Sequence, residues 1–184
     1  MNTELDILIL RLIHNNRIEL FDPILLWVSK STYPVAFIIV VYLGGLVVFK
    51  KSENIKTIFF RLICMFSVVI PIVLSLKYVV LRTRPFDLYT DIMNLSGANT
   101  PSFPSGHTVI AFTLAFGFFF SHVQRLYNWL ILGWAIIVAY SRLALGAHFP
   151  SDVLTSIAIA LMTALVFKNF TLYEWKLKRS RFTF

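Results

Sequence analysis

The chain has 184 residues, of which 58% are hydrophobic and 14% are charged, and its formal net charge at pH 7 is +8. Soluble domains average about 45–50% apolar and about 25% charged residues, so this composition excludes both a soluble globular domain and a disordered chain. The single cysteine, Cys64, excludes an intramolecular disulfide and a cysteine-based zinc site. In so apolar a chain, the positive charge favours anionic lipid over nucleic acid as a partner.

Apolar segments in chain order predict the helices, because a membrane crossing needs about 20 mostly apolar residues. Segment 4–14, interrupted by Asp6 and Arg11, predicts a helix lying in the membrane interface. Segment 22–29 predicts a short or tilted helix that begins at Pro23. Longer apolar segments predict crossings at 33–49, 55–81, 105–121, 127–146 and 151–167. The expected fold is an all-α integral membrane protein, a compact bundle of five or six transmembrane helices with an N-terminal interfacial helix.

No linker or internal repeat divides the sequence, which predicts a single domain over residues 1–184. Within it we expect interfacial and short helices in 1–32, core helices in 33–169 and a basic cytoplasmic tail in 170–184.

Short loops rich in lysine and arginine face the cytoplasm. The basic residues of such loops and of the tail are Lys50, Lys51, Lys56, Arg61, Arg125, Lys168, Lys176, Lys178, Arg179 and Arg181. With alternating crossings they fall on one side, which places segments 82–104 and 147–150 on the opposite, outer side. Arg82 and Arg84 lie on that outer side against the rule. A charge that breaks the rule indicates a functional role, although a plain loop arginine also fits either residue alone.

Polar residues far apart in the sequence fall at the outer end of the predicted helices. They are Lys77, Arg84, Ser105, His107, Arg142, His148 and Asp152. Lys77 also fits a lysine that reaches to the interface, and His107 fits an interfacial histidine. Ser105 also fits a plain N-cap, and Asp152 a carboxylate at a helix start. Arg142 is harder to explain in this way, because a lone charge inside an apolar helix costs a few kcal/mol. The shared depth of all these residues indicates one site.

The cations of this set, Lys77, Arg84 and Arg142, suit a multiply charged anion such as phosphate. Ser105 and Gly106 begin a predicted helix, where backbone N–H groups and the positive helix end also attract an anion. Gly106 lets the backbone approach that anion closely.

The two histidines and the carboxylate suit phosphoryl transfer. One histidine attacks phosphorus while the other protonates the departing oxygen, and Asp152 holds the attacking imidazole in its reactive tautomer. His148 and Asp152 are four residues apart, which permits that pairing. A two-metal hydrolase needs several carboxylates, whereas only Asp152 lies among the cations, so we predict no metal.

Three motifs carry a family resemblance. The first, K-x6-R-P, runs from Lys77 to Pro85; the second, P-S-G-H, is residues 104–107; the third, S-R-x5-H-x3-D, runs from Ser141 to Asp152. With these motifs in order at the expected helix ends, the chain resembles the type-2 phosphatidic acid phosphatase superfamily, which also contains the vanadium haloperoxidases.

The resemblance implies a role for each motif residue. His148 is the expected nucleophile that forms a phosphohistidine, Asp152 orients it, and His107 is the general acid for the leaving oxygen. The residues expected to bind the phosphate are Lys77, Arg84, Ser105, Gly106 and Arg142. The resemblance implies no metal and no cofactor.

We therefore expect a multi-pass membrane lipid phosphatase that hydrolyses a phosphomonoester or a diphosphate. The resemblance implies undecaprenyl diphosphate, phosphatidylglycerol phosphate, phosphatidic acid and lipid A 1-phosphate as candidate substrates. It also implies a bacterial cytoplasmic membrane enzyme whose site faces the periplasm or cell exterior, with lipid substrate and membrane lipids as partners. The alternatives are a non-enzymatic anion-binding membrane protein or transporter, in which the charges line a pathway, and a vanadate-dependent peroxidase, which the transmembrane content disfavours.

Overall fold

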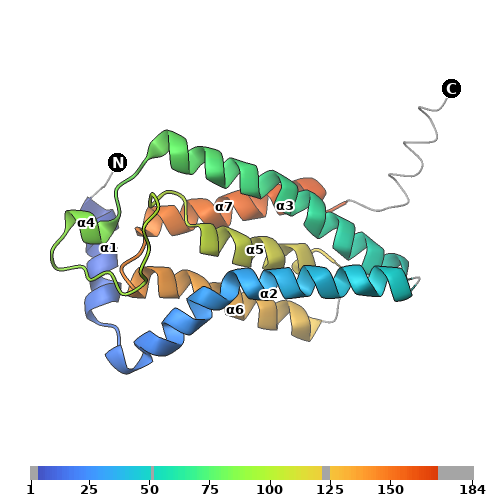
Figure 1. The fold of residues 1–184 in the computed structure, drawn as a ribbon, viewed down its shortest axis with the longest axis horizontal. Helices are drawn as coiled ribbons and strands as arrows, with labels where there is room; N and C mark the ends of the chain where they lie inside the picture. Colours follow the sequence, from blue (N-terminus) through green and yellow to red (C-terminus); the bar gives the residue numbers. More distant parts are fainter. Residues whose placement is uncertain (1–3, 51, 122–124, 170–184) are drawn as a thin grey trace.

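The computed structural model describes residues 4–50, 52–121 and 125–169. In this part of the chain, helices follow one another in a single bundle (Figure 1). They are α1 (Glu4–Asn15), the 3-10 turn η1 (Glu19–Phe21), α2 (Asp22–Phe49), α3 (Glu53–Val80), α4 (Pro85–Leu88), α5 (Gly106–Phe119), α6 (Arg125–Ala144) and α7 (Pro150–Phe167).

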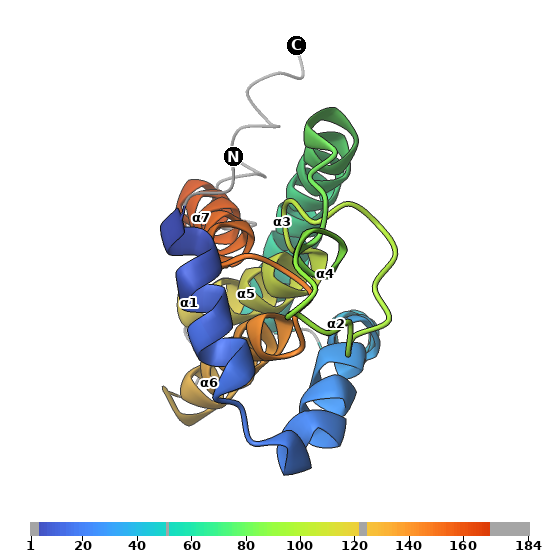
Figure 2. The same ribbon diagram turned by 90° about the vertical axis from the view of Figure 1, so that its left-hand side faces the viewer.

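Helix α5 lies in the middle of the bundle, and the other long helices surround it (Figure 2). It contacts α2, α3, α6 and α7. Its side chains from Thr108 to Ala115 are all buried. A helix that is apolar on every side is stable only when other elements cover it completely. The start of α5, which carries Gly106 and His107, is therefore held at a fixed position at one end of the bundle.

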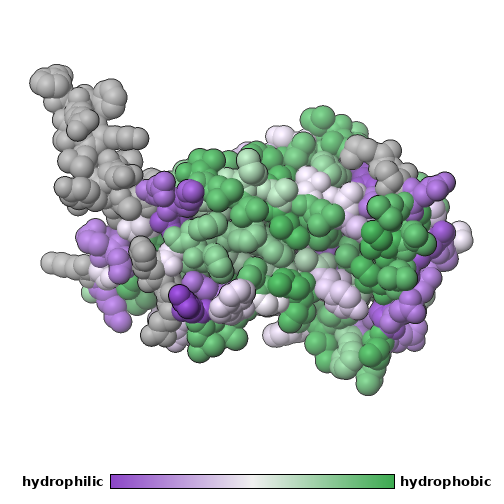
Figure 3. All heavy atoms as spheres, turned by 180° about the vertical axis from the view of Figure 1, so that it is seen from behind, coloured by the Kyte–Doolittle hydropathy of each residue, from purple (hydrophilic) through white to green (hydrophobic). Residues whose placement is uncertain are grey.

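Four helical segments of the described chain are long and apolar enough to cross a membrane, and α5 is a shorter apolar helix. The membrane-length segments are Glu19–Phe49, Glu53–Leu88, Arg125–Ala144 and Pro150–Phe167. Large apolar side chains such as Trp27, Phe37 and Tyr78 are exposed on the bundle, and Figure 3 shows an apolar surface between more polar ends. Lipid solvates such a surface and water does not. The predicted all-α membrane bundle is confirmed.

Helix α2 differs from the prediction, because 22–29 and 33–49 are parts of one continuous helix of 28 residues. The polar residues between them do not interrupt it, since Ser31 and Thr32 donate their hydroxyls to the carbonyls of Val28 (2.7 Å) and Ser29 (2.8 Å). The predicted subdivision at residue 32 therefore falls inside α2, and the segment expected to be a separate short helix is the first part of a long crossing.

One end of the bundle gathers basic residues. Arg61 of α3 donates to the carbonyl oxygens of Phe120 (2.7 Å) and Lys168 (3.0 Å), so it joins the ends of α5 and α7. The residues Lys50, Lys56 and Arg125 lie at helix ends on this same side. Lys51 and the predicted tail 170–184 lie outside the described residues.

Helix α1 crosses the opposite end of the bundle and packs on α6 and α7 (Figure 2). Asp6, Leu10 and His14 are buried and lie on one face of α1 at a spacing of four residues. Leu5 and Leu12 are exposed, as expected for a helix at the membrane interface. The predicted site residues lie at this end of the bundle, where α3 ends and α5 and α7 begin.

Candidate active site

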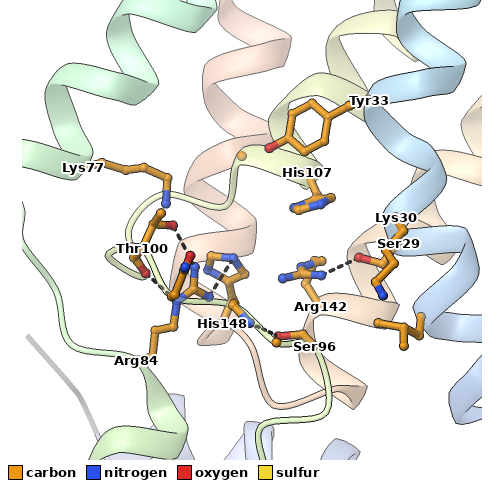
Figure 4. Close-up of a pocket in the computed structure, with 15 residues that line it drawn as sticks. Ser29, Lys30, Tyr33, Lys77, Arg84, Ser96, Thr100, His107, Arg142 and His148 are labelled. Carbon is orange, nitrogen blue, oxygen red and sulfur yellow. Dashed lines mark hydrogen bonds between the residues drawn. The ribbon is translucent and has the colours of Figure 1, made fainter.

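A cavity of about 200 Å³ opens at the end of the bundle where α5 and α7 begin (Figure 4). Residues from α2, α3, α5, α6 and the loops before α5 and α7 line it. Six of the predicted site residues are among them: Lys77, Arg84, Gly106, His107, Arg142 and His148. The structure therefore brings all three motifs to one cavity.

His148 lies in the turn between α6 and α7 and is almost completely buried. Its Nδ1 is 3.6 Å from Oδ2 of Asp152 and 3.5 Å from Oγ of Ser102. Ser102 donates its own proton to Asp152 at 2.5 Å, so both neighbours of Nδ1 are hydrogen-bond acceptors. The proton of the neutral ring is therefore on Nδ1, and the lone pair of Nε2 faces Arg84 and the cavity.

The charge state of His148 follows from its surroundings. Burial lowers the pKa of His148 to about 3, and repulsion by Arg142 and Arg84 acts in the same direction, while Asp152 opposes it. The imidazole is neutral near pH 7. A neutral imidazole with a free lone pair is the form that can attack phosphorus.

Asp152 lies in the first turn of α7, and both oxygens of its carboxylate accept hydrogen bonds. Its Oδ2 accepts hydrogen bonds from Ser102 and from the backbone N–H of Phe149 (3.0 Å). Its Oδ1 accepts a short hydrogen bond from Arg82. Asp152 does not line the cavity; its Oδ2 lies on the Nδ1 side of the His148 ring, away from Nε2.

Arg84 and Lys77 are directed into the cavity by loop carbonyls. Arg84 donates to the carbonyl oxygens of Thr100 and Ala147, each at 2.5 Å, and its Nη1 is 3.4 Å from His148 Nε2. Lys77 donates from α3 to the carbonyl of Pro101 at 2.6 Å. These contacts fix two positive charges on one side of the imidazole.

Arg142 supplies the third charge from the last turn of α6. It makes a short hydrogen bond to the hydroxyl of Ser29 on α2. Its Nε is buried and has no hydrogen-bond partner in the described part of the chain. Arg142 lines the cavity, so its guanidinium group is placed to donate hydrogen bonds to a phosphate oxygen there.

His107 faces His148 across the cavity (Figure 4). It follows Gly106 at the start of α5, and the ring of Tyr33 packs edge-on against it at 4.7 Å. A Cβ on Gly106 would lie 2.9 Å from the Tyr33 hydroxyl, so any larger residue at this position would displace the end of the Tyr33 side chain. Ser105 is fully buried at the N-cap, and its hydroxyl pairs with Thr108 at 2.9 Å, outside the cavity.

Sequence reasoning missed part of this site. Ser29 and Tyr33 belong to the first half of α2, which carries no recognisable motif. Thr100 and Ser102 belong to the loop before the second motif. Only the polar interruption of an apolar segment marks the α2 residues in the sequence, and no signal marks the loop residues, because their role depends on contacts far along the chain.

The chain is similar in sequence and in structure to known proteins. A family model described as the PAP2 superfamily matches residues 35–176. The undecaprenyl-diphosphatase BcrC of Bacillus subtilis (strain 168) is 27% identical over 172 residues, which are 93% of this chain and 84% of that protein. The undecaprenyl-diphosphatase of Sulfolobus acidocaldarius is 31% identical over 158 residues, 83% of this chain and 72% of that protein.

A solved structure has the same fold. The crystal structure of Aquifex aeolicus LpxE superposes with a TM-score of 0.75 and 27% sequence identity, covering 92% of this chain and 98% of that one. The match extends over nearly the whole of both chains, so it includes the helices that carry all three motifs.

Proposed function

Because this chain belongs to the PAP2 superfamily and is a membrane lipid phosphatase, we propose that it transfers a phosphoryl group from a lipid to His148 and then to water. The observation that carries this proposal is the orientation of His148. Asp152 and Ser102 occupy the Nδ1 side of the ring, so Nε2 is directed to a cavity that three cations line.

The first step breaks the bond between phosphorus and the lipid oxygen. The lone pair of His148 Nε2 forms a P–N bond. His107, which takes up a proton when the phosphate dianion binds among the cations, gives that proton to the departing oxygen. Lys77, Arg84 and Arg142 stabilise the negative charge on the phosphoryl oxygens as the transition state forms.

The second step returns the enzyme to its starting state. His107, now neutral, accepts a proton from a water molecule that attacks phosphorus. The P–N bond breaks, inorganic phosphate leaves, and His148 and protonated His107 are restored. This cycle needs only groups of this chain. No three His, Cys, Asp or Glu side chains gather as a potential metal site in the residues the structure describes.

An apolar groove supports a lipid as the leaving group. A second cavity of about 130 Å³ shares Tyr33, Lys77 and Gly106 with the phosphate cavity. The rest of its lining is apolar, comprising Ile70, Val73, Leu74, Val109 and Ile110. The groove lies along α3 and α5, two apolar helices of the bundle, so a lipid chain attached to the phosphate can lie against apolar side chains while the headgroup reacts.

The proposed substrate is a polyprenyl diphosphate such as undecaprenyl diphosphate. Two relatives that match over most of this chain have the name undecaprenyl-diphosphatase. Lys30 adds a further cation to the lining of the cavity and is itself exposed. A diphosphate carries more negative charge than a phosphomonoester and has a second phosphate that this lysine can contact.

The proposed location is a bacterial cytoplasmic membrane, with the cavity facing the periplasm or cell exterior. Support comes from the basic residues at the end of the bundle opposite the cavity, because positively charged loops face the cytoplasm.

A substrate panel tests this function. Purified protein in detergent is given undecaprenyl diphosphate, phosphatidylglycerol phosphate, phosphatidic acid and lipid A 1-phosphate, and free phosphate is measured with and without EDTA. We expect fastest release from the diphosphate, full activity in EDTA and no activity in H148A. Release that survives in H148A would contradict the phosphohistidine, loss in EDTA would contradict metal independence, and no release from any lipid would contradict the enzyme.

A further inference from the structure

Arg82 is a buried arginine beside the catalytic residues that the proposed reaction does not use. It lies in the loop between α3 and α4 and is only 7% exposed. Its Nη1 donates to Asp152 and, at 2.7 Å, to the hydroxyl of Ser151. Its guanidinium stacks over the ring of Phe149 at 4.1 Å. Arg82 does not line the phosphate cavity, so its contacts are with the groups that hold His148 rather than with substrate.

The other side of Arg82 is held by the N-terminal helix. Its Nη2 donates to Oδ2 of Asp6 at 2.6 Å. Asp6 lies on the buried face of α1 and is 5% exposed. Asp6 also accepts hydrogen bonds from the backbone N–H (2.8 Å) and the hydroxyl (2.6 Å) of Ser151. The carboxylate of α1 therefore binds both the arginine and the first turn of α7.

We infer that Arg82 is a positioning residue for phosphoryl transfer and that Asp6 holds it in place, so that helix α1 takes part in orienting the nucleophile. This inference rests on the proposed function of His148. Arg82 binds Oδ1 of Asp152, while Ser102 and the N–H of Phe149 bind Oδ2. With both oxygens held, the carboxylate cannot rotate, and Oδ2 remains directed at the imidazole.

Loss of Arg82 would free Oδ1 and allow the carboxylate to turn away from His148. An imidazole without a fixed acceptor samples other orientations and the other tautomer, and each of these removes the lone pair from the cavity. The phosphate-binding cations are unaffected by such a change. The structure therefore assigns Arg82 an effect on turnover and not on substrate affinity.

A second ion pair of α1 provides the matched control. Arg11 and Asp91 also join α1 to the rest of the protein, at 2.7 Å, but their side chains are 43% and 42% exposed and do not contact the site. If α1 only stabilised the bundle, weakening either ion pair would have the same effect on kcat.

Three quantities are measured for each variant: kcat and KM for phosphate release, and thermal stability in detergent. The variants are R82Q, D6N, the D6N/R82Q double variant and R11Q. We expect kcat of R82Q to fall about 10- to 100-fold, by analogy with the loss seen when a hydrogen-bond partner that orients a metal-bound histidine is removed. KM should stay within about twofold of the wild type. The kcat of D6N should fall less than that of R82Q, and the kcat of the double variant should be no lower than that of R82Q. R11Q should keep the wild-type kcat.

Single-turnover formation of the phosphohistidine separates positioning from folding. In folded R82Q this step should slow by the same factor as kcat, and R82K, which keeps a positive donor, should recover part of the rate. If R82Q does not fold, the same comparison is made on R82K and D6N. An unchanged kcat, a raised KM at constant kcat, or an equal loss in R11Q would overturn the inference. Wild-type protein without phosphate release, or full activity in H148A, would instead contradict the proposed function.

Discussion

Arg142 shows how a buried charge defines this site. It lies inside the bundle with a hydrogen bond to Ser29, and its Nε has no partner among the described residues. Holding a cation in such a place costs several kcal/mol in the absence of an anion. A bound phosphate offsets that cost. Arg142 therefore destabilises the folded protein and stabilises bound phosphate. Its effects on stability and on activity can be measured separately.

Replacing Arg142 by methionine should lower kcat/KM about 10²–10³-fold, the effect of losing one preorganised donor in a water-excluded site. Thermal stability in detergent should not fall, because an apolar side chain of similar volume replaces an incompletely paired charge. The control is R125M, which removes an exposed arginine from the other end of the same helix and should keep wild-type activity. A variant of Arg142 with near wild-type kcat/KM would remove this residue from the phosphate site.

Asp152→Asn should lower turnover far more than it lowers stability. The amide keeps the shape of the carboxylate but presents an N–H donor to His148 and favours the wrong tautomer, a change that costs about 10⁴-fold in kcat in a serine protease triad. Measurements of kcat and of the unfolding temperature on the same preparation check this. A variant that unfolds readily and yet turns over at the normal rate when folded would contradict the orienting role.

The motif residues of the site could be predicted from the sequence, and their supporting residues could not. A histidine or arginine at the end of an apolar helix is conspicuous in the sequence. Ser102 and Ser29 are ordinary hydroxyl residues, and their contacts with Asp152 and Arg142 join positions 50 and 113 residues apart. No local pattern encodes such pairings, because they depend on how the helices pack.

At the scale of elements, helix α1 and the loop before α5 are linked through one histidine. His14 is fully buried, its Nδ1–H donates to the carbonyl of Ala144 at 2.8 Å, and its Nε2 accepts the N–H of Met93 at 3.2 Å. A neutral ring satisfies both bonds. Protonation at Nε2 would remove the acceptor for Met93, so this hydrogen bond between α1 and the loop requires a neutral His14.

This arrangement predicts that stability decreases as the pH falls. Burial lowers the pKa of His14 below its ordinary value of 6.5, so the unfolded chain binds a proton more readily than the folded protein. The contribution of His14 to the free energy of unfolding is fully present above about pH 6.5 and is lost progressively below it. The pKa of His148 is also lowered, so His148 changes stability in the same direction.

The measurement is the unfolding temperature in detergent at a series of pH values. The wild type should lose stability between about pH 7 and pH 5. In H14Q, which keeps a donor and an acceptor but does not titrate, the starting stability should be lower and the slope should be shallower. Equal slopes in the two proteins would show that His14 does not contribute to this dependence.

Hydropathy predicted the long helices well, because a crossing needs a nearly uninterrupted apolar run. The exception is α2, where Lys30, Ser31 and Thr32 suggested a break. The serine and threonine hydroxyls are satisfied within the helix, and the lysine lines the cavity. The polar segment inside α2 therefore resembled the end of a helix in the sequence, although it is a continuous part of the helix beside the cavity.

For the molecule as a whole, the two ends of the bundle carry different features. The cavity and α1 lie at one end, and the basic helix ends lie at the other. In the proposed orientation, in which the basic end faces the cytoplasm, the cavity lies on the outer face of the membrane. A phosphatase with this orientation releases phosphate outside the cytoplasm and leaves its lipid product in the bilayer.

Labelling of single cysteines tests this orientation. In a C64S background, N94C lies in the loop near the cavity and S52C lies at the opposite end, and both positions are outside the long helices. A membrane-impermeant maleimide added to intact cells should label N94C and should label S52C only after the membrane is permeabilised. The reverse pattern would place the cavity on the cytoplasmic side.

The most direct test of the proposed mechanism is the identity of the phosphorylated residue. Protein mixed with lipid diphosphate whose terminal phosphate is radiolabelled is quenched within one turnover, kept at alkaline pH and digested, and the labelled peptide is identified by mass spectrometry. We expect label on His148 in the wild type and no label in H148A. Label on another residue, or normal phosphate release from H148A, would contradict the proposed mechanism.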